Sequence, residues 1–325
     1  MNHRITRAGV ALLALAALAL SACSAPTEAA PEPSSATDAW PRTVTLDDRT
    51  VTIDETPQRV VALSTETGDI ALELIGHERV AAVSHGSITD GAGNQIAEAE
   101  LVDTALPAGT NPDPEQILAL DPDLVLMTSR HEGEQDAANV LSKAGVPALI
   151  FDSSDFESID AVMAAVETIG SALGAESTAS DIVSSLTKQQ EHVLDAIADD
   201  PINSTVLLLM SRGGRQFVQS ASSTMSTLVE QAGGTVIGAS DGAVPAGPES
   251  IVAANPDVII VEDFQGAGLS PFSELLESGA LADVPAIADD ATVTVSASIA
   301  SGTSGTRTVE GLEAIASILH PDAEL

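Results

Sequence analysis

Apolar runs and amphipathic segments alternate along the first part of the chain. Residues 42–53 contain two β-branched segments, RTVTL and RTVTI, which are typical of a hairpin. Residues 59–64 (RVVALS) have the pattern of a buried strand, and residues 65–76 (TETGDIALELIG) have helical spacing and end in Gly76. With a second strand expected at residues 79–84, this alternation favours a parallel sheet covered by helices.

One phrase occurs twice in the chain. Residues 114–128 are PEQILALDPDLVLMT, and residues 248–262 are PESIVAANPDVIIVE. Each copy predicts a short helix that begins at proline, then Pro-Asp, then a buried strand. Two distant copies indicate two lobes of similar plan, and ligands of open α/β sheets bind beyond the carboxyl ends of the strands.

The segment between the two copies has a different pattern. Residues 156–200 show helical spacing throughout, and the alternation of strands and helices resumes at residue 204. The chain is therefore expected to be an α/β protein with a lobe, a helical connector and a second lobe. The predicted boundaries are 1–22 for a signal peptide, 23–42 for a disordered tether, 43–160 for the first lobe, 161–201 for the connector and 202–325 for the second lobe.

The N-terminus has the features of a secretory signal peptide. Arg4 and Arg7 precede an apolar run that is too short to cross a bilayer. The tetrapeptide LSAC that ends at Cys23 resembles a bacterial lipobox, in which the thiol is joined to diacylglycerol. We therefore expect a lipoprotein anchored to the outer face of the cytoplasmic membrane; the alternative is an ordinary cleavage site beside an unrelated cysteine.

Composition narrows the choice of partners and chemistry. The chain has 325 residues, of which 48 are acidic and 12 are Arg or Lys, and its formal net charge is -36. Such a surface repels nucleic acid and anionic headgroups, although it is also typical of proteins from salty habitats. Cys23 is the only cysteine, so if it carries lipid no thiol remains for a disulfide, a thiolate-rich metal site or a cysteine nucleophile.

The motifs together resemble a family: the substrate-binding proteins of ABC importers for iron chelates, heme and cobalamin. The resemblance runs from about Thr43 to His320 and includes both copies of the repeated phrase, LVEQAGGTVIG and SGTSGTRTVEGLEAIASIL. It implies two Rossmann-like lobes joined by a long helix over residues 178–198, with the ligand cleft between the lobes. It also implies a monomer that is not an enzyme, has no cofactor of its own, and delivers its cargo to a permease with a cytoplasmic ATPase.

Within this class the sequence looks most like the heme-binding branch. That branch ligates iron through Tyr and His, whereas this chain contains no Tyr and has Thr110 and Met210 at the matching positions. Heme is the expected cargo and a ferric siderophore is the close alternative; cobalamin, zinc or manganese remain as further alternatives. His131 and Met210 are the candidate iron ligands if the protein ligates heme iron at all.

The remaining candidates for cargo binding follow predicted strands. Arginines there suit carboxylates of a chelate or heme, although pairing with the many surface acids is equally open. Histidines in loops are often simply solvated, glycines often only form turns, and Glu66 and Thr67 also suit a helix cap. The candidates are Glu66, Thr67, His85, Thr110, Arg130, His131, Met210, Arg212, Gly213, Arg215, Phe264 and Arg307.

Two further hypotheses concern exposed residues. The resemblance implies that one glutamate from each lobe meets arginine on the permease, and Glu100 and Glu230 are the best placed; both are also typical of solvated acids. Residues 238–242 (GASDG) match the nucleophile elbow of serine hydrolases, which requires a helix directly after the serine. Two prolines follow instead, so a hydrolase is only a remote alternative.

Overall fold

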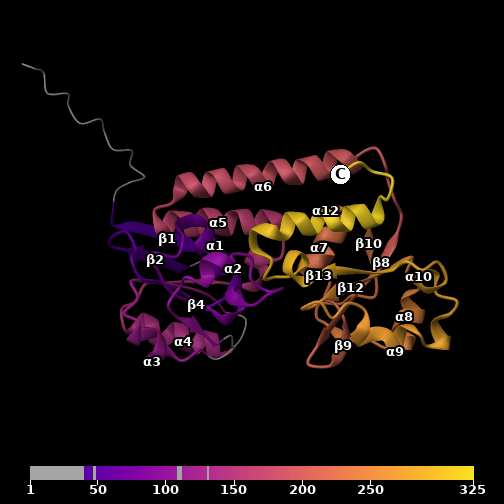
Figure 1. The fold of residues 1–325 in the computed structure, drawn as a ribbon, viewed down its shortest axis with the longest axis horizontal. Coiled ribbons are helices and arrows are strands. Elements are labelled where there is room, and N and C mark those ends of the chain that lie inside the picture. The colour runs from indigo at the N-terminus through magenta and orange to yellow at the C-terminus, as the bar shows by residue number, and fades with distance from the viewer. Residues whose placement is uncertain (1–39, 47–48, 108–111, 130–131) are drawn as a thin grey trace, which may run out of the picture. The chain divides into compact units, whose positions relative to one another are not determined.

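The structure is a computed structural model that describes residues 40–46, 49–107, 112–129 and 132–325. Residues 40–325 form one compact unit. It contains two separate sheets and a two-stranded hairpin (Figure 1). The hairpin pairs β1 (Arg42–Leu46) with β2 (Arg49–Ile53) in antiparallel register, as their β-branched segments predict.

The first sheet belongs to the N-terminal lobe and is parallel throughout. Its order is β5-β4-β3-β6-β7, so β3 and β6 are neighbours although the chain forms β4 and β5 between them. This reversal of strand order is where ligands of such sheets bind. The strands are β3 (Val60–Ala62), β4 (Val80–Ser84), β5 (Ala105–Leu106), β6 (Leu124–Thr128) and β7 (Ala148–Phe151).

Helices cover both faces of this sheet because alternate residues of each buried strand point to opposite sides. Val60 and Ala62 pack with helices α1 and α5, whereas Val61 packs with α3 and α4. Figure 1 shows these two helical layers on either side of the strands. The elements are α1 (Thr65–Ile75), η2 (His85–Ile88), α2 (Ile96–Ala99), α3 (Pro114–Ala119), α4 (Glu132–Lys143), η3 (Ser153–Phe156) and α5 (Ile159–Leu173).

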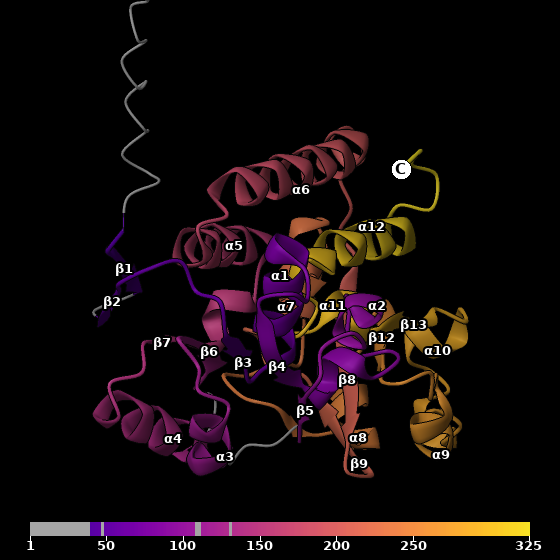
Figure 2. The ribbon, with the colours of Figure 1, turned by 60° about the vertical axis from the view of Figure 1, so that its left-hand side comes forward.

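A single long helix, α6 (Glu176–Ile197), connects the two lobes. Ala179 in its first turns packs into the N-terminal core, whereas Leu186 and Val193 pack into the C-terminal core. At 1.5 Å per residue it is about 33 Å long. Figure 2 shows α6 above α5 and the C-terminal helix α12 (Thr308–Leu319), with which it makes its main contacts. The connecting helix that the sequence predicts is confirmed.

The second sheet has the order β11-β9-β8-β12-β13, with β10 paired to β8. β8, β10, β12 and β13 are parallel, while β9 and β11 run antiparallel. The strands are β8 (Thr205–Arg212), β9 (Arg215–Val218), β10 (Thr235–Val236), β11 (Val244–Pro245), β12 (Val258–Asp263) and β13 (Thr292–Ser296). The sequence pattern predicts β8, β12 and β13 but misses β10 and the β8–β9 hairpin.

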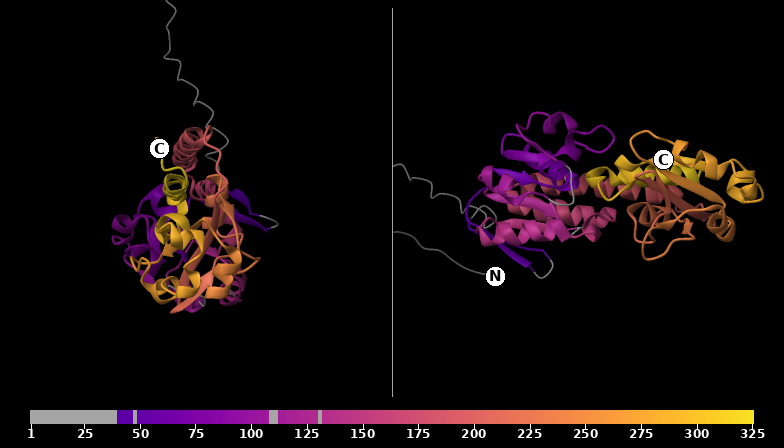
Figure 3. Two further views of the ribbon diagram at one scale, coloured as in Figure 1. Left: turned by 90° about the vertical axis from the view of Figure 1, so that its right-hand side faces the viewer. Right: turned by 90° about the horizontal axis from the view of Figure 1, so that it is seen from below.

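Helices also cover both faces of the second sheet, and two cores result. The elements are α7 (Thr224–Gln231), α8 (Pro248–Ala254), η4 (Ser270–Phe272), α9 (Ser273–Leu276), η5 (Gly279–Leu281), α10 (Pro285–Ala288), α11 (Ala297–Ala300), η6 (Gly305–Arg307) and α12. In the right-hand view of Figure 3 the N-terminal elements (indigo to magenta) and C-terminal elements (orange to yellow) form two groups. The two-lobed α/β fold is confirmed.

The repeated phrase forms the same unit in each lobe. Pro114 begins α3 ahead of β6, and Pro248 begins α8 ahead of β12. Each of these strands lies next to the first strand of its sheet, β3 or β8. The strand ends after the two copies therefore occupy equivalent positions in the two lobes.

Candidate functional site

A cavity of about 390 Å³ opens at the carboxyl ends of β8, β12 and β13. Cavities of this size bind small molecules in many proteins. Both lobes contribute, because Ser153 and Glu157 come from η3 and the residue after it while the other residues come from the C-terminal lobe. The lining is Ser153, Glu157, Met210, Arg212, Gln219, Ser223, Thr224, Glu262, Phe264, Ala300, Ser301, Gly302 and Thr303.

Arg212 is the cation of this lining, and its guanidinium is held on three sides. Its Nη2 lies 2.7 Å from Oε1 of Glu262. Glu262 is a buried residue of β12 that lines the cavity. Nη1 of Arg212 donates to the carbonyl of Ser211 at 2.9 Å, and its Cζ lies 4.6 Å from the ring centroid of Phe264. A buried carboxylate needs such a partner, and the pairing fixes the direction of the arginine.

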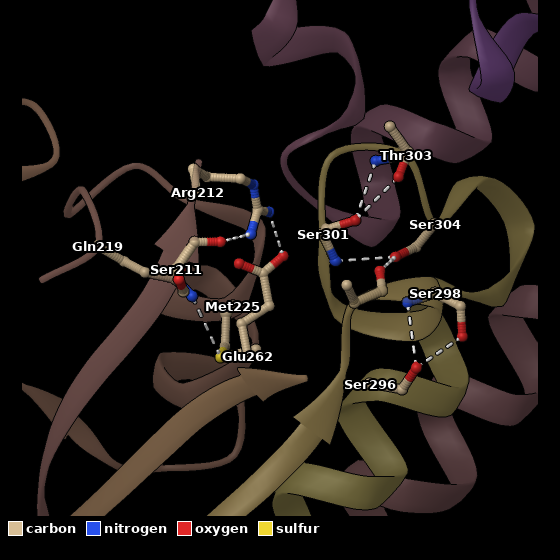
Figure 4. Close-up of polar contacts among 11 residues, drawn as sticks. Ser211, Arg212, Gln219, Met225, Glu262, Ser296, Ser298, Ser301, Thr303 and Ser304 are labelled. Atoms are coloured by element: carbon tan, nitrogen blue, oxygen red, sulfur yellow. Dashed lines mark hydrogen bonds and ion pairs between the residues drawn. The ribbon is translucent and has the colours of Figure 1, made fainter. Parts of the chain in front are cut away.

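A loop rich in serine and threonine faces Arg212 and Glu262 across the cavity (Figure 4). The hydroxyls of Ser301 and Thr303 lie 3.0 Å apart, and the Ser301 N–H donates to Ser304 Oγ at 2.8 Å. Ser304 Oγ in turn donates to the Ala297 carbonyl at 3.2 Å. These bonds hold a short hydroxyl-bearing loop in one conformation, with polar groups directed at the cavity.

The N-terminal end of α7 provides a third polar wall. Ser223 caps the helix by accepting from the Ser226 N–H, and Thr224 is almost fully buried beside it. Gln219 is also buried, and within the described part of the chain its side-chain amide donates to the Met225 sulfur alone, at 3.7 Å. Because thioether sulfur is a weak acceptor, this amide remains available to a polar ligand group.

The structure places three of the sequence candidates in this cavity: Met210, Arg212 and Phe264. Met210 and Arg212 lie at the end of β8, and Phe264 directly follows β12. Their position beyond the carboxyl ends of parallel strands agrees with the rule by which they were selected.

Glu66 and Thr67 do not line the cavity. Both are fully buried in the first turn of α1, and the Thr67 hydroxyl lies 2.8 Å from that of Ser64, the residue before the helix. The loop after β3 is too short to carry them into the cleft. They stabilise the start of α1 instead.

Gly213, Arg215 and Arg307 also lie away from the cavity lining. Gly213 and Gly214 have φ angles of 58° and 73°, which a tight hairpin turn between β8 and β9 requires. Arg215 follows this turn and lies over the ring of Phe217. Arg307 pairs with Glu310 through two bonds of 2.7 and 2.9 Å and lines a separate cavity of about 560 Å³ beside α6.

The other candidates are exposed or undescribed. His85 is exposed in η2 and does not line the cavity. Glu100 directly follows α2 and Glu230 lies in the last turn of α7, and both are exposed. Cys23, Thr110, Arg130 and His131 lie outside the described residues.

Sequence reasoning missed most of the hydroxyl and amide groups of the site. Ser301 and Thr303 belong to SASIASGTSG (residues 296–305), which begins at the last residue of β13. A Ser- and Gly-rich run after a predicted strand is the signal that points to them. Gln219 and Ser223 gave no comparable signal, because the β9 hairpin that places them was not predicted.

The hydrolase hypothesis finds no support in the local geometry. The hydroxyl of Ser240 is exposed and donates to the Gly242 carbonyl at 2.8 Å. The segment after it forms the short strand β11, whereas a nucleophile elbow is followed by a helix.

Comparison with known proteins identifies the family. Residues 60–296 match the family model of the periplasmic binding proteins. The chain belongs to the periplasmic binding protein family. Members of this family are binding proteins, which confirms the resemblance found in the sequence and the expectation that the chain is not an enzyme.

Individual periplasmic binding proteins agree with this assignment. An uncharacterized ABC transporter substrate-binding lipoprotein of Bacillus subtilis strain 168, YvrC, is 27% identical over 331 residues, which cover 97% of this chain and 98% of that protein. The fold of the apo heme-binding protein RhuT from Roseiflexus sp. RS-1 matches with a TM-score of 0.68 at 23% identity, over 81% of this chain and 98% of that one.

A siderophore-binding relative has the same fold. BauB, bound to a complex of two acinetobactin molecules and ferric iron, matches with a TM-score of 0.67 at 24% identity, over 86% of this chain and all of that one (100%). In the described part of this chain no three His, Cys, Asp or Glu side chains gather as a metal site. Among the described helices, none is long and apolar enough to span a membrane.

Proposed function

We propose that this periplasmic binding protein captures a ferric siderophore or a similar iron chelate and delivers it to an ABC importer. The observation that supports the proposal is the cavity at the strand ends, where Arg212, Glu262 and Phe264 face the hydroxyls of Ser301 and Thr303. Such a lining can hydrogen-bond to the polar periphery of a chelate. A metal already coordinated by its chelator needs no ligand from the protein.

Heme is the second candidate, and Met210 favours it. Its thioether lines the cavity and is a ligand type that heme iron accepts. Against heme, Phe264 is the single aromatic side chain among the described lining residues, and polar groups surround it. A flat macrocycle gains most of its affinity from apolar and aromatic contact.

The remaining parts of the proposal concern delivery. We propose that Cys23 carries the lipid that keeps the protein at the outer face of the membrane. Glu100 and Glu230 are exposed on different lobes and are proposed to contact the permease, one from each lobe.

The direct test is calorimetry with the unlipidated protein and a panel of a ferric hydroxamate, a ferric catecholate, hemin and cobalamin. We expect saturable binding of one ferric chelate with a stoichiometry of one. Saturable hemin binding with a shift of the Soret band would select the second candidate, and a panel without any binder would reject the iron-chelate proposal.

A further inference from the structure

The loop that lines the cavity continues directly into a contact between the two lobes. Its first part, Ser301 to Thr303, faces the cavity. The next residues, from Ser304 to Thr306, lie against the N-terminal lobe, where η6 packs on α1. A displacement of residues 304–306 at this contact would therefore also move residues 301–303, which line the cavity.

Two hydrogen bonds join the lobes at this contact, one to backbone and one between side chains. Asn94, between η2 and α2, donates its side-chain amide to the Ser304 carbonyl. Its own backbone N–H donates to Asp69 Oδ2 at 2.7 Å. Thr306 donates its hydroxyl to Glu73 Oε2, also at 2.7 Å. Asp69 thus holds Asn94, and Asn94 holds the residue that follows the cavity loop.

Asp69 is an unusual residue for this structural role, because its carboxyl group is buried close to two other acidic side chains. It is 2% exposed, and its Oδ1 accepts no hydrogen bond of good geometry from the described residues. The pKa of Asp69 is raised to about 7, chiefly by burial and to a smaller extent by Glu66 and Glu73 on the same helix, against the lowering effect of hydrogen bonds with Asn94 and Ser87. An anion at this position is therefore poorly stabilised.

Among the described residues, no cation is found among the groups that shift the pKa of Asp69. The described strands β3, β4 and β6 carry no titratable side chains. On α5, Asp160 and Glu167 are exposed, and on η2 His85 is exposed. Glu98 of α2 pairs with His77, and Arg307 of η6 pairs with Glu310. The charges that face Asp69 are those of Glu66 and Glu73.

We propose that Asp69 and Asn94 are positioning residues that hold the cavity loop Ser301–Thr303 from the opposite lobe, and that this hold weakens when Asp69 loses its proton. The inference rests on the proposed function in one respect, namely that the cargo occupies this cavity. A neutral Asp69 carboxyl remains buried against Asn94. An ionised Asp69 carboxylate is destabilised by burial and by repulsion from Glu66 and Glu73, so it moves toward water. The contact of Asn94 with Ser304 then loosens.

The first experiment uses the unliganded protein and needs no knowledge of the cargo. Hydrogen exchange of residues 301–307, corrected for intrinsic rates, is compared at pH 6 and pH 8.5. The opened loop favours the ionised acid, so linkage predicts that exchange accelerates by about tenfold between these values in the wild type. Asp69→Asn keeps a neutral side chain, and its loop exchange is expected to be the same at both pH values.

Two variants complete the test. Asn94→Ala removes the bond to Ser304 and is expected to accelerate loop exchange at both pH values, even if Asp69→Asn fails to fold. Asp195→Asn, an exposed acid on α6, is the matched control and is expected to behave as the wild type. Wild-type loop exchange that does not change between pH 6 and pH 8.5 would overturn the proposal.

The second experiment links the contact to cargo. The affinity for the best binder of the chelate panel is expected to fall severalfold from pH 6 to pH 8.5 in the wild type and to stay constant in Asp69→Asn. A chelate that binds with the same pH dependence in both proteins would refute the coupling to affinity. A panel without a binder would reject the proposed function, while the exchange data would still decide the positioning role.

Discussion

Asp123 in the N-terminal lobe and Asp257 in the C-terminal lobe make the same contact at equivalent positions. Asp123 accepts hydrogen bonds from the backbone N–H groups of Gln58 and Arg59, just before β3. Asp257 accepts from the backbone N–H and the hydroxyl of Thr205, at the start of β8. The aspartate of each Pro-Asp pair therefore stabilises the start of the strand that comes first in its sheet, β3 or β8.

Replacing either aspartate by alanine is expected to destabilise the protein. Asp123→Ala removes the acceptor of the Gln58 and Arg59 N–H groups, and Asp257→Ala removes the acceptor of the Thr205 N–H and hydroxyl. The free energy of unfolding should therefore fall by about 1 to 2 kcal/mol in each variant. Denaturant unfolding measures the change. Asp195→Ala, an exposed acid on α6, serves as the control and should change it by less than about 0.5 kcal/mol. Equal effects of all three substitutions would contradict this role.

Asp69 should make stability depend on pH in the direction opposite to most acids. Its pKa is raised to about 7 by burial, so the folded state holds the proton more tightly than the unfolded state. The stabilising effect of the proton is complete below the unfolded pKa and is lost as pH rises through about 7. Relative to wild type, Asp69→Asn should therefore gain stability between pH 4 and pH 8, by up to about 4 kcal/mol.

Urea unfolding of wild type and Asp69→Asn across this range measures that difference. Asp257 provides an internal contrast, because its hydrogen bonds with Thr205 lower its pKa. Its contribution is therefore lost as pH falls. A difference between wild type and Asp69→Asn that stays constant from pH 4 to pH 8 would show that Asp69 does not retain its proton in the fold.

Cys23 is expected to determine where the protein is found. Cys23→Ala removes the thiol that the lipid requires, so the variant should move from the membrane fraction to the soluble extracytoplasmic fraction and should no longer incorporate labelled palmitate. Cell fractionation with immunoblotting measures this. A variant that remained in the membrane fraction would argue against lipidation as the anchor.

Glu100 and Glu230 should affect transport without affecting cargo binding. Neither side chain lines the cavity. Changing both to lysine reverses two exposed charges, which should weaken docking on a basic permease surface and reduce uptake by at least about tenfold. Uptake assays in cells, with calorimetry of the purified variant, separate the two effects. The control is Glu249→Lys on α8 combined with Glu167→Lys on α5, since both side chains are exposed and one lies on each lobe.

The periodic features of the chain predicted the fold well. The doubled phrase identified α3 with β6 and α8 with β12, because a proline start and an apolar strand are encoded locally. The helix α4 was missed, since only Ala137, Ala138 and Leu141 of its twelve residues are buried and the apolar signal is correspondingly weak. The strand β9 was missed because its pairing depends on a turn at Gly213 and Gly214.

The site was less predictable, because side-chain direction depends on tertiary contacts. Arg212 and Phe264 were found by their position after strands. The same rule wrongly pointed Glu66 toward the cleft, since α1 begins so soon after β3 that this side chain is buried in the helix. Glu262, the partner of Arg212, and Asn94, the partner of Ser304, could not be predicted, because these contacts form between segments that are far apart in the sequence.

Calorimetry of two arginine variants is the most direct test of whether the cavity around Arg212 binds an iron chelate. Arg212 lines the cavity, whereas Arg215, three residues later, lies outside the lining and stacks on Phe217. With the ferric chelate that the wild type binds, Arg212→Ala should raise the dissociation constant by about tenfold or more, and Arg215→Ala should leave it within about twofold. Unchanged affinity in Arg212→Ala, or an equal loss in both variants, would contradict the account.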